Sequence, residues 1–235
     1  MRLDLSSPSL FAITENSMIT SIDPIGPFEI PPTTELVSTM TASLFDANGQ
    51  RLYITASERN AFLEVASRAD RQIRTFCMVM AYSGCRISEA LALTGKSIDF
   101  GQKAIVFETL KKRKAGVYRA VPVPDSLLDT LNMAHGLQES AKRKKNRLGL
   151  PLWEFSRTTA WRHILEVMNQ ARIPDGPHKC PKGLRHGFGV LAITQGIPLN
   201  MVSKWMGHAS LEVTAIYANA LGEEQRAIAS RMWAP

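Results

Sequence analysis

The chain has 235 residues, of which 45% are hydrophobic, so it is long enough to form one large domain with a buried core. Its formal net charge is +7 and its isoelectric point is near 9.5, which favours a polyanionic partner over a membrane. No segment approaches the roughly 18 apolar residues of a membrane-spanning helix, and the first residues lack the apolar run of a secretion signal, so we expect a cytoplasmic protein.

The charge is distributed unevenly along the chain. Residues 1–50 contain six acidic residues, one basic residue and five of the thirteen prolines, without a sustained helical or strand period. This composition is typical of an extended or partly ordered arm. Residues 51–235 contain 27 basic and 15 acidic residues. We therefore expect an acidic, proline-rich N-terminal arm over 1–50 and one basic folded domain over 51–235.

Helical patterns dominate from residue 51 onward. Thr55 and Glu58 form a capping-box pattern, which predicts the start of a first helix. A second helix is predicted to end at Gly84, because glycine adopts the left-handed conformation that commonly follows the last turn of a helix. Arg86 would then begin the next helical turn.

Residues 104–109 and 118–123 are β-prone and form the one clear hairpin pattern. Helical patterns then return: one opens at residues 124–126, one follows the capping residue Ser156, and others cover about 182–195, 199–206 and 210–217. The tail after residue 217 is amphipathic enough for a short helix. Together these elements predict an α+β fold that is mainly helical, with a small antiparallel sheet or hairpin beside a helical core.

Two clusters of basic residues lie between these elements. One is the turn between the two strands, which would project cations from the hairpin, and the other is the run over 142–147. Such a run either lies in a solvated loop or contacts phosphates without reading sequence. Lys111 is the first residue of the hairpin cluster. Seven further residues of the two clusters are the candidate DNA-binding residues: Lys112, Arg113, Lys114, Lys142, Arg143, Lys144 and Lys145.

Several segments in a fixed order carry a resemblance to a known family. Residues 83–91 read Ser-Gly-Cys-Arg-Ile-Ser-Glu-Ala-Leu, residues 183–188 read Gly-Leu-Arg-His-Gly-Phe, and residues 205–210 read Trp-Met-Gly-His-Ala-Ser. Tyr217 follows His208 by nine residues, Arg185 precedes His208 by 23, and Arg86 precedes Arg185 by 99. Over roughly residues 52–220 the sequence resembles the catalytic domain of the tyrosine recombinases, the phage integrase family.

The resemblance implies a site-specific recombinase, or integrase, that cleaves and rejoins double-stranded DNA. Arg86 and Arg185 would clamp the phosphate, because the planar guanidinium binds two oxygens and keeps its charge. His208 would contact or orient a phosphate oxygen. Tyr217 would be the nucleophile, leaving a 3′-phosphotyrosyl bond and a free 5′ hydroxyl. A phenol with a pKa near 10 needs a positive environment for this attack.

Two lysines complete the catalytic set that the resemblance implies. Lys111, on the hairpin turn, would give a proton to the departing 5′ oxygen, with Lys112 and Lys114 as alternatives because the register of the turn is open. Lys182 stands where the family usually has histidine, and it would donate a hydrogen bond to phosphate. The cationic side chains would neutralise the phosphate, so no metal ion and no cofactor are expected.

The same residues have ordinary structural interpretations. Arg86 could simply pair with Glu89 on a helix, and Tyr217 could be a core residue. His186 is interpreted as a core histidine or a neighbour of the catalytic residues in preference to a direct phosphate ligand. Gly187 and Gly189 interrupt a predicted helix, and they would allow a close approach of backbone or DNA.

Alternative functions and the partners follow from the same resemblance. A type IB topoisomerase-like enzyme would relax supercoils as a monomer, and a DNA-binding regulator would keep the fold without the reaction. Recombination joins two duplexes, so a homo-oligomer, a tetramer on DNA, is implied. Typical family members carry a helical DNA-binding domain before the catalytic one, and only about 50 residues precede Arg51. The chain is therefore expected to act as a catalytic domain alone or with an accessory DNA-binding protein.

Overall fold

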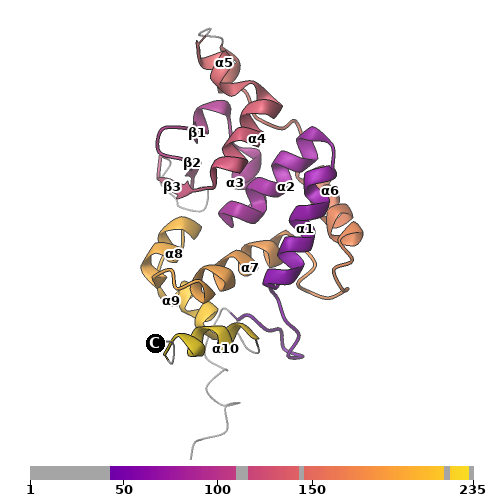
Figure 1. The fold of residues 1–235 in the computed structure, drawn as a ribbon, viewed down its shortest axis with the longest axis vertical. Helices are drawn as coiled ribbons and strands as arrows, with labels where there is room; N and C mark the ends of the chain where they lie inside the picture. Colours follow the sequence, from indigo (N-terminus) through magenta and orange to yellow (C-terminus); the bar gives the residue numbers. More distant parts are fainter. Residues whose placement is uncertain (1–42, 110–115, 143–145, 220–222, 233–235) are drawn as a thin grey trace, which may run out of the picture. The chain divides into compact units, whose positions relative to one another are not determined.

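The computed structural model describes residues 43–109, 116–142, 146–219 and 223–232, drawn in colour in Figure 1. The folded unit that contains them begins at Thr41. Leu44 is buried, and Phe45 pairs with Arg51 in a short antiparallel bridge. These residues belong to the described structure, and the boundary near Arg51 stays a prediction. Residues 1–42, most of the predicted acidic arm, lie outside the described residues.

The first helices begin and end at the predicted signals. The side chain of Thr55 accepts a hydrogen bond from the Glu58 backbone N–H, and the Glu58 carboxylate accepts one from the Thr55 N–H, which confirms the capping box. Gly84 adopts a left-handed conformation with φ of 58° and ends the second helix. The three helices of this part are α1 (Ala56–Arg68), α2 (Arg71–Ser83) and α3 (Ile87–Leu91).

The predicted hairpin forms two strands of a three-stranded antiparallel sheet. The strands are β1 (Ile98–Asp99), β2 (Ala104–Glu108) and β3 (Tyr118–Pro122), in the order β1-β2-β3. The two-residue β1 is too short to give a sequence pattern. In β3 the side chains of Arg119 and Val121 are buried, whereas their neighbours are exposed. The hairpin therefore points one arginine into the molecule.

Helices make up the rest of the described chain, as predicted. The helix that follows Ser156 and the helices near 182–195 and 199–206 are confirmed to within one or two residues. The helix expected over 210–217 is shorter, because the chain tightens into a 3₁₀ turn at Ile216. The helices are α4 (Asp125–His135), α5 (Leu137–Lys142), α6 (Arg157–Gln170), α7 (Pro181–Thr194), α8 (Leu199–Met206), α9 (Glu212–Ala215) and α10 (Glu223–Ala229). The 3₁₀ turns are η1 (Gly95–Ser97), η2 (Asn146–Gly149), η3 (Ile216–Asn219) and η4 (Ser230–Met232).

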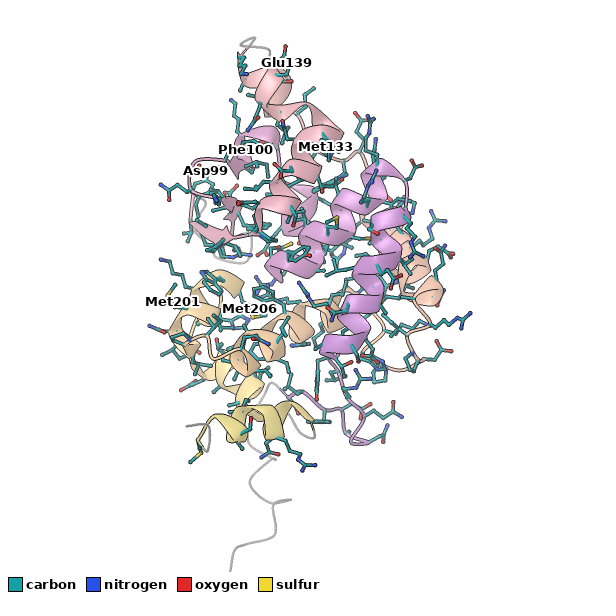
Figure 2. All side chains as sticks on the ribbon, viewed as in Figure 1. Asp99, Phe100, Met133, Glu139, Met201 and Met206 are labelled. Carbon is teal, nitrogen blue, oxygen red and sulfur yellow. The ribbon has the colours of Figure 1, made fainter. Side chains whose placement is uncertain are left out.

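Two clusters of buried apolar side chains hold these elements together. The larger one includes residues of α1, α2, the sheet, α4 and α6, and the smaller one includes residues of α7, α8 and η3. Helix α7 packs against α2 and also against η3, so it joins the two clusters. Figure 2 shows Met206 and Met201 on α8; Met206 is buried and Met201 is partly exposed. The α+β, mainly helical prediction is confirmed.

The predicted helix in the C-terminal tail is present as α10, which packs against α7 in the same chain (Figure 1). None of the described helices is long and apolar enough to cross a membrane.

Candidate active site

A pocket of about 570 Å³ opens between the two apolar clusters. Its walls come from the start of α3, the first turns of α6 and α7, the segment after α8, and η3. The described side chains that line it include four cations and no carboxylate, so the pocket favours an anion. The lining residues are Cys85, Arg86, Ile87, Ser88, Arg157, Trp161, Pro181, Lys182, Arg185, His186, His208, Val213, Ile216 and Tyr217.

Arg86 is held at the start of α3 by a buried carboxylate. Its Nη1 lies 2.8 Å from Glu89 Oε1, and its backbone N–H donates to Glu89 Oε2 at 2.8 Å. This confirms the predicted Arg86–Glu89 pair without excluding Arg86 from the pocket. On its other side, Glu89 is paired with Arg119 of β3, whose Nη2 lies 2.7 Å from Oε2. Burial raises the pKa of Glu89, but the hydrogen bonds and charges of the two arginines lower it overall.

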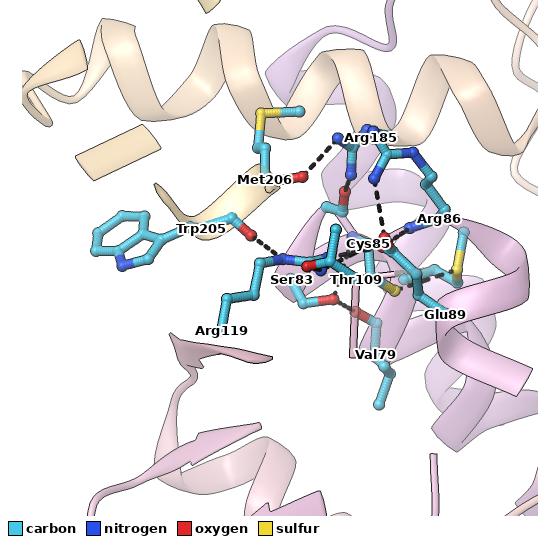
Figure 3. A network of polar contacts seen from close by, with 12 residues as sticks. Val79, Ser83, Cys85, Arg86, Glu89, Thr109, Arg119, Arg185, Trp205 and Met206 are labelled. Atoms are coloured by element: carbon cyan, nitrogen blue, oxygen red, sulfur yellow. Dashed lines mark hydrogen bonds and ion pairs between the residues drawn. The ribbon is translucent and has the colours of Figure 1, made fainter. Parts of the chain in front are cut away.

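Arg119 connects this ion pair to the end of α8. Its Nε donates to the Trp205 carbonyl oxygen at 2.7 Å, and Figure 3 shows the chain of contacts from Trp205 through Arg119 to Glu89 and Arg86. The Arg119 and Glu89 side chains are 4% and 0% exposed. Since a buried charge needs a partner, each of these groups depends on the others for its position.

Arg185 lies on α7 with its guanidinium held by two backbone carbonyls. Nη1 donates to Gly84 at 2.7 Å and Nη2 donates to Met206 at 2.6 Å, as drawn in Figure 3. Burial is the main cause that lowers its pKa to about 10, and the charge of Arg86 adds to the effect. The group is therefore still a cation at neutral pH. Its five N–H donors exceed the two carbonyl contacts, which leaves donors for a phosphate.

His208 follows the left-handed Gly207 that ends α8. Its Nδ1 lies 2.7 Å from Thr214 Oγ1, and Thr214 is fully buried. This contact fixes the orientation of the ring, and Nε2 is the ring nitrogen that Thr214 does not contact. Burial and the charges of Arg185 and Arg86 lower the pKa of His208 to about 3. The imidazole is neutral at pH 7, and it acts as a hydrogen-bonding group without adding charge.

Tyr217 lies in η3 with its side chain 1% exposed, yet it lines the pocket. Its hydroxyl contacts Nδ1 of His186 at 3.2 Å, and its ring stacks on the ring of His208 with centroids 6.1 Å apart. Burial raises the pKa of Tyr217 to about 12, although the charges of Arg185 and Arg86 act in the opposite direction. Its neutral phenol needs further stabilisation to act as a nucleophile.

The structure brings together five of the six predicted catalytic residues. Arg86, Lys182, Arg185, His208 and Tyr217 all line the one pocket, and Lys182 is exposed at its edge. Lys111 lies outside the described residues, as do the candidate DNA-binding residues Lys112, Arg113, Lys114, Arg143, Lys144 and Lys145. Lys142 is exposed at the end of α5 and is not a pocket residue.

Sequence reasoning did not single out every residue of the site. Arg119 belongs to none of the motifs, but its place between Tyr118 and Ala120 in an alternating strand puts it on the buried face with Val121. His186 is the neighbour of the predicted nucleophile, which agrees with its interpretation as a neighbour of the catalytic residues. Among the described residues, no three His, Cys, Asp or Glu side chains gather as metal ligands.

A profile of the phage integrase family matches residues 53–224, so the chain belongs to this family and the resemblance is confirmed. Tyrosine recombinase XerA of Pyrococcus furiosus is 26% identical over 187 residues, which cover 76% of this chain and 60% of the relative. Tyrosine recombinase XerD of Mycobacterium leprae is 29% identical over 187 residues, which cover 72% of this chain and 57% of the relative. The chain thus spans less than two thirds of these relatives.

Solved structures show the same fold. The crystal structure of XerA recombinase has a TM-score of 0.62 at 21% identity, over 79% of this chain and 66% of the other. A second crystal structure shows XerH site-specific recombinase bound to its difH substrate before cleavage. It has a TM-score of 0.56 at 19% identity, over 81% and 60% of the two chains.

Proposed function

We propose that this chain is the catalytic domain of a site-specific DNA recombinase that cleaves and rejoins DNA through Tyr217. The observation that carries the proposal is that Tyr217 lines the same pocket as Arg86 and Arg185, together with two further cations and no carboxylate among the described lining residues. A DNA phosphate is the anion that such a pocket fits, since guanidinium groups bind the nonbridging oxygens in pairs. The recombinases similar to this chain, one of them bound to its DNA substrate, support the same activity.

In the proposed reaction, Tyr217 Oη gives its proton to solvent water and forms a bond to phosphorus, and the bond from phosphorus to the 5′ oxygen breaks. The 5′ oxygen takes up a proton, for which Lys111 is the proposed donor. The DNA end is then held as a 3′-phosphotyrosyl ester, and attack by a 5′ hydroxyl reverses the step. Arg86 and Arg185 stabilise the negative charge that builds on the phosphate oxygens. The proposed reaction uses side chains of this chain and solvent water, without a metal ion or a cofactor.

Lys182 and His208 complete the proposed phosphate site. Lys182 stands at the exposed edge of the pocket, where its ammonium group is free to reach a phosphate oxygen. His208 has Nδ1 bound to Thr214, so its Nε2 is the nitrogen that would donate to the phosphate. Double-stranded DNA is the proposed partner, with four subunits on two duplexes. An accessory DNA-binding protein is proposed as the source of further affinity.

The decisive experiment is capture of covalent protein–DNA complexes from cells that express the chain, followed by sequencing of the attached DNA. Tyr217→Phe is measured in parallel, because it keeps the buried ring and removes the attacking oxygen. We expect DNA from discrete sites with the wild-type chain and background amounts with the variant. Equal recovery from both would rule out cleavage by Tyr217 and favour a DNA-binding regulator. Recovery of scattered sites would favour a topoisomerase-like enzyme.

A further inference from the structure

His186 is the residue that contacts the hydroxyl group of the proposed nucleophile. Its Nδ1 lies 3.2 Å from Tyr217 Oη, and its Nε2 is buried without a hydrogen-bond partner among the described residues. We propose that His186 is a further catalytic residue, which donates its Nδ1–H to Oη and stabilises the charge on that oxygen during attack and departure. This inference rests on the proposed role of Tyr217.

The backbone of α7 places His186 against Tyr217. Gly189 lies three residues later, on the same face of the helix, and a Cβ atom at that position would be 2.5 Å from Cζ of Tyr217. The absence of a side chain at Gly189 therefore lets the ring approach the helix closely enough for His186 to reach the hydroxyl. The rings of His186 and Tyr217 are tilted by 55° with centroids 5.8 Å apart, so they meet through their polar atoms and not by stacking.

The second histidine beside Tyr217 does not compete for this role. His208 stacks on the tyrosine ring with an angle of 19° between the planes, and its Nδ1 is occupied by Thr214 at 2.7 Å. His208 therefore holds the face of the ring, whereas His186 contacts the reacting oxygen.

The buried surroundings indicate which nitrogen of His186 carries the proton. Burial, with the charges of Lys182 and Arg185, lowers the pKa of His186 to about 4, so the ring is neutral at pH 7 and has one N–H. A proton on Nε2 would be a buried N–H without a partner, which is rarer in proteins than a buried acceptor without one. A proton on Nδ1 is directed at Tyr217 Oη. The one N–H group of the neutral ring thus donates its hydrogen bond to Tyr217 Oη.

A donor at this position acts in both directions of the reaction. During cleavage the Oη–H bond breaks and the Oη–P bond forms, so Oη carries negative charge for part of the step. When the strand is rejoined, the Oη–P bond breaks and Oη again carries negative charge. Burial opposes this charge, as the raised pKa of Tyr217 shows. A neutral N–H of His186, 3.2 Å from Oη, replaces the hydrogen bond that water would otherwise give to this charge. It does so without accepting a proton itself.

The first test needs no DNA. Long-range proton–nitrogen NMR spectra of the full chain resolve the two nitrogens of each of its five histidines, and His186→Asn identifies the His186 signals. We expect Nδ1 of His186 to carry the proton and its resonance to move in Tyr217→Phe. A proton on Nε2, or a resonance unchanged by Tyr217→Phe, would overturn the proposal.

The second test compares rates of covalent complex formation on DNA recovered by the capture experiment. We expect His186→Phe, which keeps a ring and removes the donor, to slow cleavage roughly 10- to 100-fold at saturating DNA with unchanged DNA affinity. In His186→Asn the side-chain amide lies near the position of Nδ1, and it should restore much of the rate. The matched control is His135→Phe, since His135 is a partly buried histidine that contacts Thr75 away from the pocket.

These results separate the two proposals. If Tyr217→Phe abolishes covalent complexes and His186→Phe cleaves at the wild-type rate, Tyr217 keeps its role and the inference about His186 is wrong. If His186→Asn is as slow as His186→Phe although both are folded, the hydrogen bond is not the reason for the loss. If Tyr217→Phe still forms covalent complexes, the proposed function itself fails.

Discussion

At the scale of single residues, burial sets the charge state of the site. The pKa values of His208 and His186 are lowered to about 3 and about 4, mainly because burial disfavours the charged ring and then because nearby cations repel it. Both histidines are neutral at pH 7, so the positive charge of the pocket comes from its arginines and Lys182. The pocket thus combines four cationic side chains with two neutral histidines.

These pKa values predict how stability depends on pH. In the unfolded chain a histidine titrates near pH 6.5, so between about pH 6.5 and pH 4 the unfolded state binds more protons than the folded state. The free energy of unfolding should therefore fall as the pH falls through this window. Urea denaturation at pH 7 and pH 5 measures the loss, which should be smaller in His208→Asn. An equal loss in the variant would contradict the assigned pKa of His208.

Gly189→Ala tests the close approach of Tyr217 to α7. The added methyl group would lie 2.5 Å from the tyrosine ring, and relieving such an overlap costs about 1–3 kcal/mol, against about 1 kcal/mol gained in helix propensity. We expect a lower free energy of unfolding and fewer covalent DNA complexes. The control is Gly149→Ala, where no atom lies within 4 Å of the added group. Equal effects in the two variants would show that the contact is unimportant.

At the scale of elements, the buried Arg119–Glu89 ion pair joins the sheet to helices that border the pocket. Arg119 of β3 pairs with Glu89 of α3 and donates to the carbonyl of Trp205 in α8, so three elements share one side chain. The segment after Trp205 carries His208, and Glu89 also holds Arg86. The position of Arg119 therefore affects both the first arginine and the histidine of the pocket.

Removal of Arg119 should be costly. Arg119→Met leaves Glu89 buried with one partner, and losing a partner from a buried ion pair typically lowers the free energy of unfolding by about 3–5 kcal/mol. The matched control is Lys103→Met, because the Lys103–Asp125 pair is 62% exposed on both sides, and water and salt screen such a surface pair so that its loss should cost far less stability. Chemical denaturation of both variants makes the comparison. Similar losses would mean that the buried pair contributes no more than a surface pair.

At the scale of the whole molecule, charge is divided between the N-terminal residues and the folded unit. Residues 1–40 contain five acidic residues and one basic residue, whereas the residues from 51 onward contain 27 basic and 15 acidic ones. An acidic segment on the same chain lowers the average attraction of the basic domain for DNA. This long-range repulsion depends on ionic strength, since about 1 M salt reduces the screening length to roughly 3 Å.

A chain that starts at Thr41 should therefore bind double-stranded DNA of arbitrary sequence more tightly than the full chain at low salt. We expect a gap of several-fold, which closes as salt is added. Fluorescence anisotropy of labelled duplexes over a salt series measures it. Equal affinities at low salt would show that the acidic residues have no electrostatic effect on DNA binding.

The features that could be predicted from the sequence are those that short stretches of the chain encode. Helix starts and ends, the hairpin and the order of Arg86, Arg185, His208 and Tyr217 are encoded by short motifs and spacings. The structure places these four residues in one pocket, as their resemblance to the family implied. The 3₁₀ turn at η3 and the two-residue β1 escaped prediction, since elements this short contain no full period.

The tertiary structure alone decided the contacts between the residues of the site. The Arg119–Glu89 pair joins residues 30 positions apart, and the His186–Tyr217 contact joins residues 31 apart. Their partners depend on how α3, α7, η3 and β3 pack, and no local pattern records that packing. By itself the sequence determined the family and the order of the longer elements, and it predicted three of the four cations that line the pocket, Arg86, Lys182 and Arg185. Burial, which exists only in the folded chain, decided which of these groups are charged and which atoms face the Tyr217 hydroxyl.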